Sequence, residues 1–173
     1  MAQTTASQTI GPYWHIIEDK DWADLTRFGA QGEKLVLTGT IRDGDGAPCP
    51  EACVEIWQSD PPASDTFPGF GRANTDATGT FRLTTIRPGP VAGRGNTQQA
   101  PHIAICILSR GVMAALMTRA YFAGEALNET DPLLTSIEDP AQRATLIAKP
   151  EGGHVWRLDI RLQGEGETVF LDI

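Results

Sequence analysis

The stretch "APHIAICIL", residues 100–108, points to a β-rich fold and carries one unusual residue. It reads as a strand, in which side chains two residues apart share a face. His102 therefore points the same way as Ala104 and Cys106. A strand histidine directed at a functional site usually has other reactive side chains on its face, whereas the next side chain here is a methyl group. The stretch thus predicts a strand and singles out a histidine without its natural neighbour.

Other parts of the chain repeat this strand pattern. Alternating or turn-bounded apolar runs predict further strands at residues 34–41, 52–58, 80–86, 116–122, 154–162 and 168–172. Helices are expected at residues 21–28 and 138–148, the second with Asp139 as N-cap and Pro140 in the first helical position. About seven strands and two short helices favour an all-β fold, an antiparallel β-sandwich of about seven or more strands with long loops.

Length and composition agree with this class. A chain of 173 residues favours one domain, and 18 glycines with 12 prolines suit frequent turns. Residues 1–20 lack periodicity and are predicted to form an N-terminal arm, followed by the domain at residues 21–173.

Charge and cysteines limit the classes of function. The formal net charge of −8 argues against nucleic acid and anionic membranes as partners. No apolar run approaches the roughly 18 residues of a membrane span, and the first residues do not resemble a secretory signal. Cys49, Cys53 and Cys106 are odd in number and lack zinc-ligand spacing, which favours free thiols in a cytoplasmic setting.

Two segments carry candidate binding residues. In residues 116–122, Arg119 shares a face with Met117 and Tyr121, where a guanidinium could hold a carboxylate by two parallel hydrogen bonds. Alternatively, it is an edge-strand arginine that reaches solvent. In residues 7–15, Gly11–Pro12 permits close backbone approach to a ligand, although a terminal arm docked on its own domain would explain the same pattern. His102 could likewise be a metal ligand or a hydrogen-bonded core histidine.

Several longer stretches together resemble the intradiol ring-cleaving dioxygenases. They run in order from about Thr5 to Ile173 and comprise "SQTIGPY", "EIWQSD", "FGRANTDATGTFRLTTIRPGP", "APHIAI", "TRAYF", "LIAK" and "RLDIRLQGEGETVFLDI". No single stretch is decisive, but their order and combined length make the resemblance specific.

The resemblance implies a metal site that this chain has lost. Catalytic members hold non-haem Fe(III) with two tyrosines and two histidines, the histidines forming H-x-H on one strand. Here the first is His102, and Ala104 stands in place of the second. Val91 occupies one tyrosine position, residues 59–71 contain no tyrosine for the other, and Gln99 replaces an active-site arginine. His102, Ala104, Val91 and Gln99 are therefore interpreted as a vestigial site that binds no metal.

The same resemblance implies a shared function. It indicates an α-type subunit with no catalytic residue of its own, paired with an iron-holding β subunit into αβ protomers of a larger oligomer. The expected reaction is O2-dependent cleavage of protocatechuate between its two hydroxyl-bearing carbons, giving 3-carboxy-cis,cis-muconate. The expected substrate-pocket residues, shared with the β subunit, are Thr9, Gly11, Pro12, Tyr13 and Arg119, and the arm at residues 1–20 is expected to dock on that partner.

Two other functions remain open on sequence alone. A non-enzymatic β-sandwich binding module, for instance for carbohydrate, should expose an aromatic platform, yet Trp57 and Trp156 have core-like neighbours. A self-sufficient dioxygenase with unusual ligands would have only Tyr13 and Tyr121 to use, and neither matches a ligand position.

Overall fold

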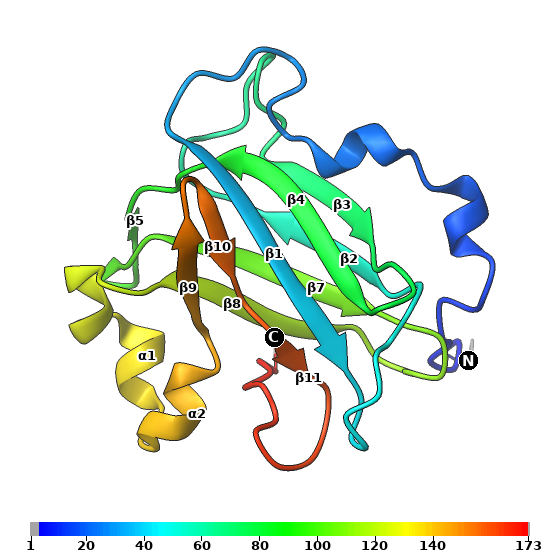
Figure 1. The fold of residues 1–173 in the computed structure, drawn as a ribbon. Coiled ribbons are helices and arrows are strands. Elements are labelled where there is room, and N and C mark those ends of the chain that lie inside the picture. Colours follow the sequence, from blue (N-terminus) through cyan, green and yellow to red (C-terminus); the bar gives the residue numbers. More distant parts are fainter. Residues whose placement is uncertain (1–3, 173) are drawn as a thin grey trace.

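The computed structural model describes residues 4–172 and has an all-β architecture (Figure 1). Its longer strands are β1 Lys34–Arg42, β2 Cys53–Trp57, β3 Phe70–Asn74, β4 Thr80–Ile86, β7 His102–Leu108, β8 Leu116–Phe122 and β9 Ile147–Gly152. The shorter strands are β5 Val91–Ala92, β6 Gln98–Gln99, β10 Val155–Arg157 and β11 Ile160–Arg161. The helices are η1 Trp14–Ile17, η2 Lys20–Ala23, η3 Ala126–Glu129, α1 Pro132–Ser136 and α2 Pro140–Ala144.

One continuous sheet forms the body of the molecule. Its hydrogen-bonded order is β4-β1-β10-β9-β8-β7-β2-β3, and β11 also pairs with β1. The two end strands β3 and β4 lie beside each other without a shared ladder, so the sheet curls nearly into a barrel. The predicted all-β class is confirmed, and the two layers expected of a sandwich are parts of one curled sheet.

The pairing is mixed rather than purely antiparallel, which corrects the prediction. Strands β10 and β11 both run parallel to β1, and β9 runs parallel to β8. The predicted strand at residues 154–162 is split because the Asp159 carboxylate accepts the Thr40 N–H at 2.9 Å, where a ladder carbonyl would otherwise stand. The predicted strand at residues 168–172 is reduced to a single bridge between Leu171 and Met117.

The helix predictions were right in place and wrong in length. Helix α2 begins at Pro140, and the Asp139 side chain accepts the Ala141 N–H as its cap. It ends at Ala144, because the chain then enters β9 beside β8. The segment at residues 21–28 forms only the 3₁₀ helix η2 and turns, since Leu25 is drawn into the core and its N–H bonds to Thr84.

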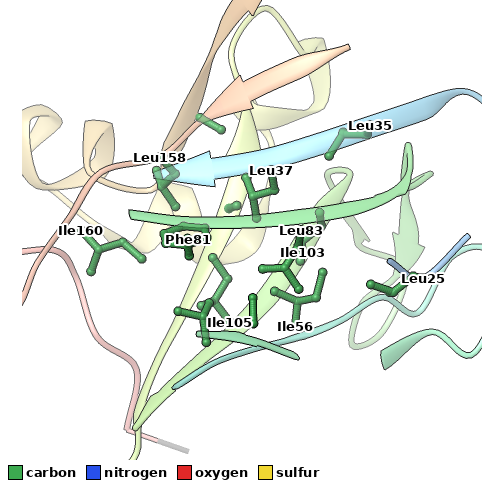
Figure 2. Close-up of a cluster of buried hydrophobic side chains, with 14 of the residues drawn as sticks. Leu25, Leu35, Leu37, Ile56, Phe81, Leu83, Ile103, Ile105, Leu158 and Ile160 are labelled. Atoms are coloured by element: carbon green, nitrogen blue, oxygen red, sulfur yellow. The ribbon is translucent and has the colours of Figure 1, made fainter. Parts of the chain in front are cut away.

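The hydrophobic core fills the inside of the curled sheet (Figure 2). Leu35 and Leu37 from β1, with Phe81 and Leu83 from β4, meet Ile56 from β2 and Ile103 and Ile105 from β7. Leu25 from the η2 segment reaches the same core from the side of β3 and β4. The inner faces of β2 and β7 are therefore committed to packing, and only their outer faces can carry a site.

Candidate functional site

The outer face of the β7–β8 hairpin carries the residues singled out from the sequence. In the ladder, His102 pairs with Tyr121 and Ala104 pairs with Arg119. Directly paired residues share a face, so these four side chains lie on the side opposite Ile103 and Ile105. The predicted face of His102 is thus confirmed, and Arg119 lies beside the position where the second histidine would be.

Val91 and Gln99 join this group through a small second sheet. Strand β5 pairs with β6, which places Val91 opposite Gln99. The Gln99 Oε1 accepts a hydrogen bond from Nη1 of Arg119 at 2.8 Å. Residues from three separate parts of the sequence are therefore brought together around Arg119.

A buried relay holds Arg119 in place. The same Nη1 also donates to the hydroxyl of Tyr121 at 3.1 Å, and that hydroxyl donates to Oδ1 of Asp131 at 3.1 Å. Tyr121 and Asp131 are fully buried, and burial raises the pKa of the Tyr121 hydroxyl well above its ordinary value. Tyr121 therefore stays a neutral phenol, whose hydroxyl accepts a hydrogen bond from Arg119 and donates one to Asp131.

His102 is engaged in local structure. Its Nδ1 lies 2.7 Å from the carbonyl oxygen of Ala100, and its ring lies 5.4 Å from the Tyr121 ring, centroid to centroid. Burial lowers the pKa of His102, and the nearby Arg119 adds to that effect. The interpretation as a hydrogen-bonded histidine accounts for these contacts.

The side chains here do not fit a ferric ion. At the two positions where the resemblance to intradiol dioxygenases implies a tyrosine and a histidine, Val91 and Ala104 carry hydrocarbon groups, which cannot ligate a metal ion. Within residues 4–172, no three His, Cys, Asp or Glu side chains gather closely enough to hold a metal ion. The donor chemistry of this site is that of a guanidinium, an amide and a hydroxyl, which binds anions rather than cations.

The predicted arm residues lie at the other end of the same hairpin. The Thr9 hydroxyl donates to the carbonyl of Ser109 and accepts from the N–H of Gly111, both at 2.9 Å. The chain then turns at Gly11, whose φ of +78° suits glycine, and passes through Pro12 to Tyr13. Tyr13 is 72% exposed, so its ring is not packed on this chain.

The Trp14 indole anchors the arm to the domain. It is buried and donates to the carbonyl of Glu51 at 2.7 Å, and Glu51 adopts a left-handed φ of 59° to present that oxygen. Beyond the anchor, Ile16 and Ile17 are 69% and 85% exposed. The arm is thus fixed at Thr9 and Trp14 while its apolar side chains face outward, and residues 1–3 lie outside the described part.

The structure separates the predicted pocket residues into two groups. Thr9 contacts the loop after β7, whereas Arg119 pairs with Ala104, five residues before Ser109. At about 3.3 Å per residue, the two groups lie roughly 17 Å apart along the strand. Within this chain alone, the arm and Arg119 do not form one pocket.

The cysteines play no part in this arrangement. All three are free thiols, and burial raises the pKa of Cys53 to about 12 and also raises the pKa of Cys49 and Cys106. A raised pKa keeps a thiol protonated and unreactive. Cys53 and Cys106 are buried and pack as small apolar residues, whereas Cys49 is half-buried.

Two features of this face were not predicted from the sequence. Asp131, which fixes Tyr121, was not singled out, although the Asp-Pro pair at 131–132 repeats the signal recognised at Asp139–Pro140. Trp57 is not surrounded by core but is 41% exposed, with its ring 4.9 Å from that of Phe70. Trp57 pairs with Ala104, which places this aromatic pair in line with Arg119.

Comparison with known proteins gives these residues a context. A family model described as Dioxygenase matches residues 11–164. The protocatechuate 3,4-dioxygenase alpha chain of Pseudomonas putida is 40% identical, covering 97% of this chain and 96% of that protein. The corresponding alpha chain of Burkholderia cepacia is 36% identical, covering 98% of this chain and 97% of that protein. The beta chain of the same organism is 30% identical, covering 96% of this chain and 79% of that protein.

Solved structures agree with the sequence relatives. A dioxygenase domain from Streptomyces sp. SirexAA-E, found in a fusion with a carbohydrate-binding protein, superposes with a TM-score of 0.65 at 28% identity, covering 94% of this chain and 99% of that one. An intradiol ring-cleavage dioxygenase of Tetranychus urticae shares the fold at a TM-score of 0.63 and 21% identity, covering 91% and 94%. The family model, the full-length relatives and the shared fold establish that this chain belongs to the intradiol dioxygenase family.

Proposed function

We propose that this chain is the iron-free α subunit of a protocatechuate 3,4-dioxygenase, acting with a β subunit that holds Fe(III). Two relatives matched over nearly their whole length carry the alpha-chain name. The observation that carries the proposal is that Val91 and Ala104 have hydrocarbon side chains where the resemblance implies metal ligands, while His102 makes a hydrogen bond with Ala100. A subunit without ligands can contribute to ring cleavage only through shape, charge and contact with a partner.

The expected partner has the same fold as this chain. The beta chain of Burkholderia cepacia is 30% identical to it, so an α and a β subunit of this kind would be two related curled sheets. We infer that αβ protomers build a larger oligomer and that the arm at residues 1–20 docks on the β subunit. The exposed side chains of Tyr13, Ile16 and Ile17 support this role, because apolar groups presented on an anchored arm are typical of an interface.

The proposed reaction joins O2 to protocatechuate and yields 3-carboxy-cis,cis-muconate, with cleavage between the two hydroxyl-bearing carbons. In this chain Thr9, Gly11, Pro12 and Tyr13 would border the partner's pocket and exclude water from it. Arg119, which lies roughly 17 Å from the Thr9 contact along β7, would supply a positive charge for the substrate carboxylate from a separate part of the contact with the β subunit. The three free thiols support the proposed cytoplasmic setting.

The exposed aromatic side chains do not favour a carbohydrate-binding module. A sugar-binding platform needs roughly coplanar rings. The Trp57 and Phe70 rings are tilted by 49°, and the Trp22 and Phe70 rings meet at 89°. Such an irregular surface suits a protein partner better than a flat sugar ring.

Co-expression with a β-type subunit tests the proposed function. We expect the pair to co-purify, to contain iron in proportion to the β subunit, and to cleave protocatechuate. The chain purified alone should hold no stoichiometric iron by metal analysis and should be inactive. Stoichiometric iron bound by the isolated chain, or an active β subunit that never associates with it, would overturn the proposal.

Replacement of Arg119 tests its part in the complex. In the co-assembled enzyme, Arg119→Ala should raise the KM for protocatechuate about tenfold, the value of one charge-assisted contact. Steady-state kinetics would measure the change, and Arg82→Ala, at an exposed arginine of β4, serves as the matched control. An unchanged KM would remove Arg119 from the pocket.

A further inference from the structure

An open cavity of about 740 Å³ is lined in part by Pro132, Leu133 and Ser136 of α1. Arg119 and Gln99 also line it. Leu133 and Ile137, from α1 and the residue after it, and Phe170 from the C-terminal segment supply apolar walls. The volume suits a small organic molecule. The cavity combines one fixed cation with hydrocarbon surface.

Hydrogen bonds fix the orientation of the Arg119 guanidinium in this cavity. Nη1 of Arg119 is fixed by Gln99 and by the Tyr121 hydroxyl, which is itself oriented by the buried carboxylate of Asp131. Because the Tyr121 hydroxyl donates its hydrogen bond to Asp131, its oxygen is free to accept one from Arg119. The guanidinium therefore keeps one orientation without a bound ligand.

The rest of that guanidinium has spare hydrogen-bonding capacity. Within residues 4–172, both of its hydrogen bonds use Nη1, and no carboxylate oxygen lies within the 4.0 Å of an ion pair. Nε and Nη2 together form the fork that binds a carboxylate by two parallel hydrogen bonds. A half-buried cation with open donors favours an anionic ligand.

The charges around the cavity agree with this preference. Arg94 also lines it, and Asp172 is the one acidic residue among its lining residues within the described part of the chain. Both are exposed and lie at its rim. A ligand with one negative charge and an apolar body would match the charges and the walls together.

We propose that this cavity is a binding site for a small aromatic carboxylate, one molecule per chain, formed without iron and without a partner subunit. The carboxylate would bind Nε and Nη2 of Arg119, and the ring would pack against Leu133 and Phe170. The anionic class follows from the cavity alone, and the choice of an aromatic acid rests on the proposed function.

The test titrates the full-length chain, purified alone and treated with a chelator, with benzoate by isothermal calorimetry. Benzyl alcohol serves as the neutral probe of matching shape. We expect one benzoate per chain and at least roughly tenfold weaker binding of benzyl alcohol. Arg119→Gln should weaken benzoate binding about tenfold, Asp172→Asn should strengthen it, and Arg82→Gln should leave it unchanged.

The outcomes distinguish binding through the Arg119 charge from apolar binding of either probe, and they test this site separately from the proposed function. Equal affinity for both probes, no saturable benzoate binding, or unchanged affinity in a thermally stable Arg119→Gln would overturn the inference. Arg119→Lys keeps the charge without the fork and should retain part of the affinity. If the isolated chain binds benzoate but the αβ complex does not cleave protocatechuate, only the proposed function is contradicted. If the complex cleaves protocatechuate but the isolated chain does not bind benzoate, only this site is contradicted.

Discussion

Asp131→Ala is expected to lower the free energy of unfolding by about 4 kcal/mol, because it leaves several buried donors without partners. Asp131 is fully buried and accepts four hydrogen bonds, from the N–H groups of Ala100, Leu133 and Leu134 and from the Tyr121 hydroxyl, all at 2.8–3.1 Å. Without this carboxylate, the start of α1 would lose the side-chain hydrogen bond that joins it to Ala100, in the segment that leads into β7. Urea denaturation followed by circular dichroism measures the change.

Asp139→Ala provides the matched control for this prediction. Asp139 also precedes a proline and caps a five-residue helix, but it is exposed, and its side chain accepts one hydrogen bond, from Ala141. Its loss should cost about 1 kcal/mol. Similar losses in the two variants would show that Asp131 acts only as a helix cap and not as the centre of a buried network.

Gly39→Ala is the second substitution with a large expected effect. A Cβ added at Gly39 would lie 1.8 Å from the Leu158 carbonyl oxygen and 2.9 Å from the Phe81 ring. A backbone carbonyl cannot move aside as a flexible side chain can, so β1 would have to separate from the 158 segment, the chain around Leu158 between β10 and β11. We expect a loss of roughly 3 kcal/mol or more, and a fall in Tm of about 10 °C by calorimetry.

Gly44→Ala tests whether contact with backbone causes that loss. Gly44 follows the same strand, yet its added Cβ would meet the Gln163 side chain at 3.5 Å, an ordinary contact. The Tm of this variant should stay within about 2 °C of the unmodified chain, since surface changes of this kind cost little. A Gly39→Ala protein as stable as Gly44→Ala would mean that β1 and the 158 segment can separate freely.

Local signals predicted much of the fold. The alternation in residues 102–108 predicted a strand with His102 and Ala104 on one face, and Asp139–Pro140 marked the start of α2. What periodicity could not supply was strand direction. The parallel pairing of β10 and β11 with β1 depends on contacts between residues more than a hundred positions apart, and the break between β10 and β11 depends on Asp159 reaching Thr40.

The candidate site was predicted in part for a similar reason. Face alternation placed His102 beside Ala104, and spacing placed Arg119 beside Tyr121. The approach of Gln99 to Arg119 depends on how a long loop folds back as β5 and β6, for which one sequence offers no periodic signal. Trp57 was assigned to the core because apolar type alone does not distinguish a buried face from an interface.

The parallel pairing of β1 has a consequence for synthesis of the chain. During translation β1 and β4 emerge early and can pair at once, but the other edge of β1 must wait for residues 155–161. Until then a nascent polypeptide carries an open row of peptide groups along its longest strand, where another chain can add. We therefore expect the risk of association with other chains to be highest before residues 155–161 are synthesised and cover this edge of β1.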